Sequence, residues 1–343
     1  MSAVLVTGAS GFIGLAITRA LVARGCRVVA LNRSAPPALA ALERGGQVRI
    51  VRADLADKDA VVAAAAGVEA VFHVAGRPGL VGRYADFYDA NVRGTEHVLH
   101  AMRTHRIEKL VHTSTPSVVH PGGDLEGGDE SLPYADHFAS AYPETKAIAE
   151  RAVLAASGTE LGGGKRLWTV AIRPHLVWGP DDPNFAPRIL ARARRGRLAL
   201  VGGGVKRVDA THLDAAVHAH LCAFDRLGPG AACAGRPYFI AQGEPMPLRE
   251  LVFRFLRAAG LPERARSIPL PIALALGTAV ETAYRTFRPG VEPPLTRFVA
   301  EQLGTAHWYR LDAARRDLGY EAPLRTDEGF RRLAAHWQAH GAP

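Results

Sequence analysis

A tyrosine and a lysine four residues apart are the clearest chemical signal in the sequence. Tyr142 and Lys146 frame the segment YPETK, which we predict to begin a helix. Residues at this spacing lie on one face of a helix, so the phenol and the ammonium would be neighbours. A nearby positive charge lowers the pKa of a phenol and suits it to exchange a proton with a substrate oxygen. Because the chain has only five lysines, a lysine at this position favours acid–base chemistry.

Hydroxyl side chains follow a strand predicted at residues 109–113. Ser114, Thr115 and Ser117 could each donate a hydrogen bond to a substrate carbonyl. Hydroxyl residues after a strand more often belong only to a turn. These three therefore support a catalytic site only in combination with the tyrosine and the lysine. The pattern alone does not choose among the three.

A glycine-rich turn near the start of the chain predicts a dinucleotide site. Gly8 permits a tight turn after a strand, Gly11 lets the backbone approach a pyrophosphate, and Gly14 allows a helix to pack closely on the sheet. The N–H groups at the start of that helix would bind the anion. The candidate residues are Gly8, Ser10, Gly11, Phe12, Ile13 and Gly14.

The end of the second predicted strand favours NADPH, with NAD as the alternative. An acidic residue there would bind the 2′-hydroxyl of NAD, but the sequence has Asn32, Arg33 and Ser34, which suit a 2′-phosphate. The alternative for Arg33 is a solvated surface arginine. After the third strand, Asp54 and Leu55 are placed to contact the adenine, although Asp54 could instead cap the next helix.

Alternating strands and helices must position these residues. Strands are predicted at residues 3–7, 27–31, 48–52, 70–73, 109–113 and 168–173. With helices between them, they predict an α/β fold of the Rossmann type, a doubly wound parallel sheet with a smaller, interleaved C-terminal substrate lobe. The NADP-binding domain is expected at residues 1–179, with 205–235 returning to it, and the substrate lobe mainly at 180–204 and 236–343.

Composition and charge exclude several classes of protein. With 343 residues, 48% hydrophobic and 22% charged, the chain is neither disordered nor fibrous. Three widely spaced cysteines argue against a disulfide framework and a metal site. The net charge of +9 is scattered, so an acidic substrate or partner is favoured over nucleic acid. The N-terminus lacks signal-peptide features, and a cytoplasmic location is expected.

The most apolar segment, residues 268–287, is too short and too interrupted to cross about 30 Å of hydrocarbon. We expect an amphipathic helix that covers an apolar substrate pocket. The alternative is a helix that docks on a membrane surface, which would make the protein peripheral to the membrane.

Several motifs together resemble the extended short-chain dehydrogenases/reductases. They are TGASGFIG, HVAG at residues 73–76, Asn91 with Gly94 and Thr95, Tyr142 with Lys146, and RPHLVWGP at residues 173–180. The segments HTSTPSVVH, YPETKAIAERAVLAA, EPPLTRFVAEQL and HWYRLDAARRDLGY resemble the 3β-hydroxysteroid dehydrogenase-like branch, and within it the bacterial 2-alkyl-3-oxoalkanoate reductases of olefinic hydrocarbon biosynthesis. The resemblance spans nearly the whole chain.

The resemblance implies a catalytic role for three residues. Tyr142 matches the general acid, and Lys146 matches the residue that holds the nicotinamide ribose and tunes the phenol. The usual serine, which donates to the substrate carbonyl, is Thr115 here. This departure keeps the hydroxyl, but Ser114 or Ser117 could share the role.

The resemblance also extends the cofactor site. Ala75 and Gly76 belong to the HVAG stretch, and Pro174 to Val177 match the backbone that meets the nicotinamide carboxamide. His112 stands where this branch often has tyrosine or another bulky residue, so a structural role is expected for it.

The implied reaction is the NADPH-dependent reduction of a long-chain 2-alkyl-3-oxoalkanoate to the 3-hydroxy acid. One alternative is a sterol-4α-carboxylate 3-dehydrogenase or 3β-hydroxysteroid dehydrogenase, which would oxidise with NAD. Another is a non-catalytic NADP-sensing regulator, which the presence of both Tyr142 and Lys146 disfavours. The resemblance further implies a homodimer through helices beginning near Asn91 and Tyr142, and contact with other enzymes of the pathway.

Overall fold

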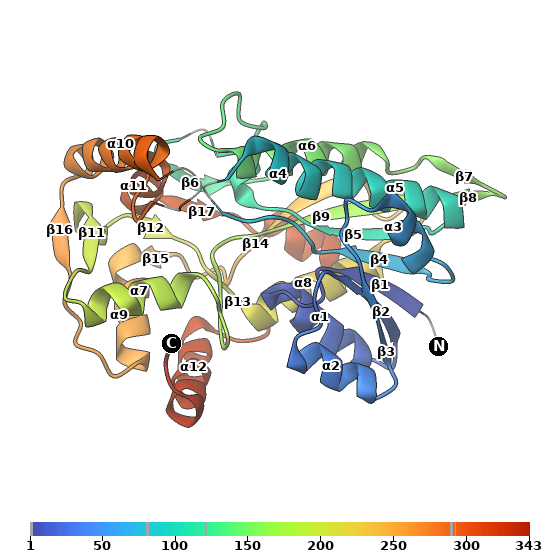
Figure 1. Ribbon diagram of the computed structural model, residues 1–343, viewed down its shortest axis with the longest axis horizontal. Helices are drawn as coiled ribbons and strands as arrows, with labels where there is room; N and C mark the ends of the chain where they lie inside the picture. The colour runs from blue at the N-terminus through green and yellow to red at the C-terminus, as the bar shows by residue number, and fades with distance from the viewer. Residues whose placement is uncertain (1–2, 80–81, 121, 289–290, 292) are drawn as a thin grey trace.

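A seven-stranded parallel sheet forms the centre of the larger lobe (Figure 1). The computed structural model describes residues 3–79, 82–120, 122–288, 291 and 293–343. The strands of the sheet are β1 (Ala3–Thr7), β2 (Arg27–Asn32), β3 (Val48–Arg52), β4 (Ala70–His73), β5 (Lys109–Thr113), β9 (Trp168–Pro174) and β14 (Arg236–Ile240). Their order is β14-β9-β5-β4-β1-β2-β3, which confirms the predicted fold class.

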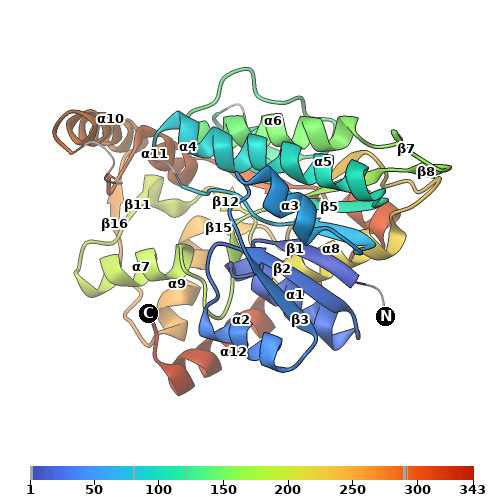
Figure 2. The same cartoon turned by 45° about the vertical axis from the view of Figure 1, so that its right-hand side comes forward.

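Helices cover both faces of the sheet (Figures 1 and 2). They are α1 (Phe12–Ala23), α2 (Pro37–Arg44), α3 (Lys58–Ala64), α4 (Tyr84–Tyr88), α5 (Gly94–His105), α6 (Ala141–Ala155) and α8 (Leu213–Arg226). Side chains alternate between the faces of a strand. In β1, Val4 and Val6 pack with residues of α1, α2 and α8, whereas Leu5 packs with residues of α3, α5 and α6. The near-continuous apolar strands of the sequence are therefore buried on both sides.

The chain returns to the sheet from the second lobe through α8 and β14. Strand β14 pairs with β9 in parallel along its whole length. The sequence predicted that residues 205–235 return to the sheet, but β14 begins one residue later. Strand β14 therefore belongs to the sheet, although the sequence assigned residues from 236 onward mainly to the substrate lobe.

The second lobe has a separate core between three helices. These are α7 (Phe185–Arg194), α9 (Leu248–Ala258) and α12 (Thr326–His340). Trp178, Phe255 and Phe330 meet at its centre, where the rings of Trp178 and Phe330 stack with centroids 4.2 Å apart. Large buried aromatic rings contribute most to the stability of such a core.

Short strands and two further helices complete this lobe. The strands are β6 (Leu125–Gly128), β10 (Val177–Trp178), β11 (Ala199–Val201), β12 (Arg207–Val208), β13 (Thr211–His212), β15 (Met246–Pro247), β16 (Arg266–Ile268) and β17 (His307–Tyr309), while β7 (Glu160–Gly162) and β8 (Lys165–Arg166) form a hairpin beside the large sheet. Helices α10 (Leu270–Phe287) and α11 (Arg297–Gly304) pack against each other. No helix within the described ranges is both long and apolar enough to cross a bilayer.

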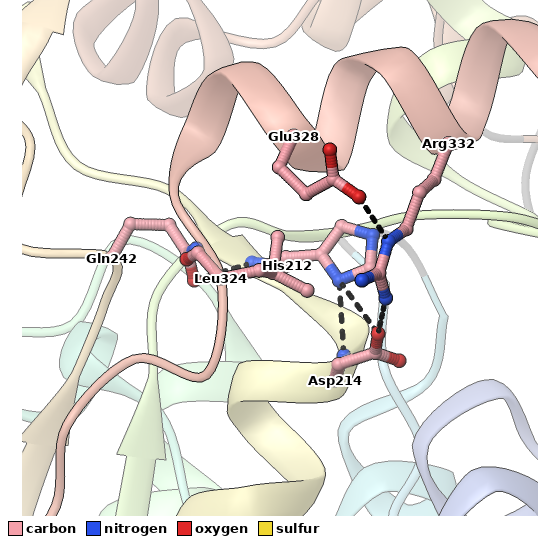
Figure 3. A network of polar contacts seen from close by, with 6 residues as sticks. All are labelled: His212, Asp214, Gln242, Leu324, Glu328 and Arg332. Carbon is pink, nitrogen blue, oxygen red and sulfur yellow. Dashed lines mark hydrogen bonds and ion pairs between the residues drawn. The ribbon is translucent and has the colours of Figure 1, made fainter.

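Hydrogen bonds fasten the C-terminal helix to both lobes (Figure 3). Arg332 on α12 lies 3.4 Å from the carboxylate of Asp214 in the first turn of α8. Nδ1 of His212 accepts from the Asp214 backbone N–H at 3.2 Å, and the His212 N–H donates to the Gln242 side chain at 3.1 Å. The amide of Gln242 also donates to the Leu324 carbonyl at 2.8 Å. Helix α12 is thus joined to the start of α8, and the segment before it is joined to the residues after β14.

Candidate active site

The predicted site residues line one cleft at the carboxyl ends of the parallel strands. The cleft has a volume of about 1120 Å³, and its walls come from the turns after β1 to β5 and β9, from α6 and from α7. The predicted residues that line it are Gly8, Ser10, Gly11, Phe12, Ile13, Gly14, Asn32, Arg33, Ser34, Asp54, Leu55, Ala75, Gly76, Thr115, Tyr142, Lys146, Pro174 and Val177. Open parallel sheets bind their ligands at this edge.

The glycine turn has room for backbone but not for side chains. Gly8 has a φ of 69°, which favours glycine, and a Cβ there would lie 2.8 Å from the backbone of Ala75. A Cβ on Gly14 would lie 2.1 Å from the Gly8 carbonyl oxygen, and one on Gly11 would lie 3.2 Å from the same atom. The turn therefore forms a close-packed cradle before α1 that fits the pyrophosphate of a dinucleotide.

The end of β2 has one buried and two exposed residues. Oδ1 of Asn32 accepts a hydrogen bond from the Ser10 N–H at 2.9 Å, so this side chain holds the glycine turn. Arg33 and Ser34 are exposed at the rim of the cleft. The guanidinium of Arg33 is 3.9 Å from the Asp54 carboxylate, and its side chain is 81% exposed. Arg33 and Ser34 thus offer a cation and a hydroxyl at the cleft rim.

Two aspartates after β3 have different roles. Asp57 caps α3 by accepting from the Ala60 N–H at 3.0 Å. Asp54 accepts from the Ala56 N–H at 3.0 Å in the turn before it and lines the cleft together with Leu55. Asp57 is therefore the helix cap, and the adenine contact of Asp54 stays a prediction.

Helix α6 presents Tyr142 and Lys146 to the cleft from its first two turns. Nζ of Lys146 donates to the Thr113 carbonyl at 2.6 Å and to Nε2 of His112 at 3.3 Å. The phenol of Tyr142 is hydrogen-bonded to the Thr115 hydroxyl. The end of β5 therefore holds the lysine, and the residues that follow it reach the tyrosine.

Burial has the largest influence on the titration of both groups. It raises the pKa of Tyr142, and the hydrogen bond from Thr115 opposes this rise. It lowers the pKa of Lys146 to about 8, while the Glu150 carboxylate acts in the opposite direction. We predicted that Lys146 would lower the phenol pKa. In the structure the hydrogen bond from Thr115 lowers the phenol pKa, and the influence of Lys146 on it stays a prediction.

The three hydroxyls occupy different positions. Ser114 and Thr115 line the cleft, whereas Ser117 lines a neighbouring cavity of about 90 Å³. Oγ of Ser114 is buried and has no hydrogen-bond partner among the described residues. Oγ1 of Thr115 lies 3.2 Å from Oγ of Ser117 and accepts from the Ser117 N–H at 3.3 Å. Ser117 therefore orients Thr115, and the two cleft hydroxyls are the candidates for the substrate carbonyl.

Asn91 fastens the loop after β4 to helix α6. Its Oδ1 accepts from the Arg77 N–H at 2.6 Å, and its Nδ2 donates to Oγ1 of Thr145 at 2.9 Å. A Cβ on Gly76 would lie 3.2 Å from Asn91 Oδ1. The sequence showed Asn91 only as a point of resemblance, and its role depends on this long-range contact.

The start of α7 supplies a wall of the cleft that the sequence analysis did not identify. Asn184, Phe185 and Arg188 line the cleft. The carboxylate of Asp182 accepts from the Phe185 N–H at 3.1 Å and the Ala186 N–H at 2.8 Å. An aspartate before an apolar run is a helix-capping signal. This signal could have predicted the start of α7 at Phe185.

Known proteins match the chain over most of its length. The model of the 3-beta hydroxysteroid dehydrogenase/isomerase family matches residues 5–272. A 2-alkyl-3-oxoalkanoate reductase of Stenotrophomonas maltophilia (strain K279a) is 48% identical over 334 residues, which are 97% of this chain and 98% of that protein. The decarboxylating sterol-4-alpha-carboxylate 3-dehydrogenase of Homo sapiens is 32% identical over 333 residues, 95% of this chain and 86% of that protein.

Among solved structures, a UDP-glucuronic acid 4-epimerase from Bacillus cereus in complex with NAD has a TM-score of 0.74 over 99% of both chains. At 19% identity this likeness shows the fold alone. The family model, in contrast, covers more than half of the chain, and both relatives extend over nearly all of it. The chain therefore belongs to the 3-beta hydroxysteroid dehydrogenase/isomerase family.

Proposed function

We propose that this protein is an NADPH-dependent reductase of the 3-keto group of long-chain 2-alkyl-3-oxoalkanoates. The observation that carries the proposal is the meeting of Tyr142, Lys146 and Thr115 in one cleft with the glycine turn. Family membership makes the chain an NAD(P)-dependent oxidoreductase. The identity with the Stenotrophomonas maltophilia reductase over nearly the whole chain supports the substrate class.

The residues of the cleft divide the work of a carbonyl reduction. A bound reduced nicotinamide supplies a hydride to the ketone carbon. Tyr142 gives its hydroxyl proton to the ketone oxygen, so the phenol O–H bond breaks as the product O–H bond forms. Thr115 and Ser114 are placed to donate hydrogen bonds to the same oxygen and to stabilise its developing charge. The cationic Lys146 stabilises the phenolate that remains on Tyr142.

A substrate screen tests this function against its alternatives. NADPH consumption is measured with 2-alkyl-3-oxo acids of increasing chain length, and NAD reduction with 3-hydroxysterols and their 4-carboxylates. Consumption of NADPH with the oxo acids is the expected result. Turnover of the sterols with NAD would instead support the dehydrogenase that the 32% identical human relative suggests. Tight NADPH binding without turnover of either class would indicate a sensor.

Replacing Arg33 by alanine is expected to weaken NADPH binding by about ten- to a hundredfold and to leave NADH binding nearly unchanged. The guanidinium lies at the cleft rim, where it can pair with a 2′-phosphate that NADH lacks. Fluorescence titration of both cofactors measures the effect. Arg49→Ala on the neighbouring strand β3 is the matched control. Equal weakening of both cofactors by Arg33→Ala would make this arginine structural and remove the preference for NADPH.

Helix α10 offers a surface for peripheral membrane contact, which we propose in place of the predicted cover over the substrate pocket. None of its described residues lines the cleft. Ile272, Leu276 and Phe287 are 52%, 47% and 80% exposed. Exposed arginines stand at both ends of the helix, Arg266 before it and Arg288 after it. An apolar face bordered by cations suits an anionic bilayer.

The double change Ile272→Gln and Leu276→Gln is expected to lower binding to vesicles of phosphatidylglycerol by at least about tenfold, because two exposed apolar side chains no longer enter the bilayer. Cosedimentation measures the binding, with phosphatidylcholine vesicles as the control for charge. The pocket-cover hypothesis predicts a different result in solution without vesicles. There the preference for long over short acyl chains would shrink in the variant while vesicle binding stayed at the parent level.

A further inference from the structure

The ammonium of Lys146 is held from behind by two acceptors. The Thr113 carbonyl oxygen lies 2.6 Å from Nζ, and Nε2 of His112 lies 3.3 Å from it. On the side of the cleft, a Cβ built on Gly76 would lie 3.9 Å from the same nitrogen. An ammonium has three N–H donors. Two donors with fixed acceptors therefore leave the third to point toward the cleft.

His112 can accept this hydrogen bond only as a neutral imidazole with its proton on Nδ1. Because an ammonium donates and never accepts, Nε2 must carry the lone pair. Burial first, and then the charge of Lys146, lower the pKa of His112 well below its usual value, which keeps the ring neutral. Nδ1 finds no hydrogen-bond partner among the described residues. A side chain that only fills space would avoid the cost of this unpaired N–H.

We propose that His112 is a positioning residue for Lys146, whose Nε2 accepts one ammonium N–H and so keeps the lysine cationic and directed at the cleft. The inference rests on the proposed function only in giving Lys146 a part in catalysis. It replaces the structural role that the family resemblance implied for His112.

The other histidines near this pair stay neutral and have their own partners. The ring of His73 on β4 lies 5.1 Å from that of His112, and its two nitrogens are bonded to Oγ1 of Thr7 at 2.8 Å and of Thr95 at 2.9 Å. Burial and the nearby lysine lower the pKa of His73 to about 3. On the opposite face of the sheet, burial lowers the pKa of His220 to about 4. Neither ring competes with His112 for the ammonium.

The charged neighbours are on α6 and β9. Glu150 lies one helical turn after Lys146, and its carboxylate raises the lysine pKa. Arg173 donates from Nε to this carboxylate at 3.0 Å, so the pair is neutral as a whole. Tyr142 is a neutral acid with a raised pKa. Replacing His112 by a neutral residue thus removes an acceptor and leaves every formal charge in place.

The test uses lysine labelled with 13C at Cε in the chain without added cofactor. The five lysines give five signals, and loss of one signal in Lys146→Arg assigns the site. In the parent, Lys146 is expected to titrate near pH 8. In His112→Phe, which keeps the bulk without the acceptor, the midpoint is expected to fall by about one pH unit. In His112→Gln, the side-chain oxygen restores an acceptor and the midpoint is expected to return toward that of the parent.

A midpoint unchanged in His112→Phe would overturn the proposal. His220→Phe removes an equally buried imidazole from the other face of the sheet, and its lysine midpoint is expected to match the parent. If His112→Phe does not fold, the parent itself decides, because 15N shifts report the imidazole tautomer. The expected result is a proton on Nδ1 of His112. A proton on Nε2 would contradict the hydrogen bond from Nζ of Lys146 to Nε2 and overturn the proposal.

The same change has a readout in catalysis. The cationic lysine is the working form, so the rate is expected to fall as the pH rises through the Lys146 pKa of about 8. The alkaline limb of kcat/KM should move to lower pH in His112→Phe and back in His112→Gln. The labelling experiment needs no substrate, so it keeps its meaning if the oxo acid proves to be the wrong substrate. If the lysine midpoint shifts in His112→Phe but the alkaline limb of kcat/KM does not, the effect of His112 on Lys146 is absent during catalysis, which would contradict a positioning role in the reaction.

Discussion

Replacing Tyr142 by phenylalanine is expected to lower turnover of a 2-alkyl-3-oxo acid by about two to four orders of magnitude, the usual contribution of a positioned general acid. Phenylalanine keeps the ring in the first turn of α6 and removes only the proton donor and its hydrogen bond with Thr115. NADPH affinity should change little, because the groups predicted to bind the pyrophosphate and the 2′-phosphate are in the glycine turn and at the end of β2. Single-turnover kinetics and a separate cofactor titration measure the two effects.

Tyr320→Phe is the matched control for this change. Its hydroxyl is also buried and donates to the Ala241 carbonyl at 2.8 Å, but Tyr320 does not line the cleft. The control should lose some stability and keep turnover within about tenfold of the parent. Turnover of Tyr142→Phe within the same range would mean that another group protonates the substrate.

Breaking the buried ion pair of Glu150 and Arg173 is expected to cost about 3–5 kcal/mol of unfolding free energy. Glu150 is 0% and Arg173 1% exposed, and Oη of Tyr134 also donates to the Glu150 carboxylate at 2.8 Å. Arg173→Met removes the cation from β9 and leaves the carboxylate buried without its charge partner. Urea denaturation measures the loss.

Two further variants separate this penalty from a general loss of packing. Replacing both partners, as Glu150→Leu with Arg173→Met, removes the unpaired charge and should recover much of the lost stability. Arg24→Met breaks an exposed pair with Asp225, where the side chains are 41% and 52% exposed, and should cost less than about 1 kcal/mol. Equal losses for the buried and the exposed single variants would show that burial does not set the cost.

Local patterns predicted the parts of the fold that depend on neighbouring residues. Strands β1, β3, β4 and β5 lie at the predicted residues, because an apolar run is visible within each segment. The glycine turn and the YPETK segment were equally local, and the fold brings them into one cleft. The catalytic and cofactor roles of these residues, the homodimer and the cytoplasmic location stay predictions.

Pairings between distant segments could not be predicted in the same way. The three-residue strand β17 pairs with β6, which lies far earlier in the chain. Such short strands carry too little periodicity to be recognised before their partner is known. His112 shows the same limit at the level of one side chain. Its contact with Lys146 depends on how α6 packs over the end of β5, which no pattern around residue 112 reveals.

The place of β14 in the sheet limits how this chain can be recombined with a relative. Apart from β6, the second lobe is formed by an insertion between the neighbouring strands β9 and β14 and by a C-terminal segment. A chimaera with one junction after β9 would import a foreign α8 and β14 and mismatch the core of the sheet. Substrate preference should therefore be exchanged by grafting residues 180–212, 242–308 and 321–343, with α8, β14 and the residues 309–320 that pack in the core of the sheet left native.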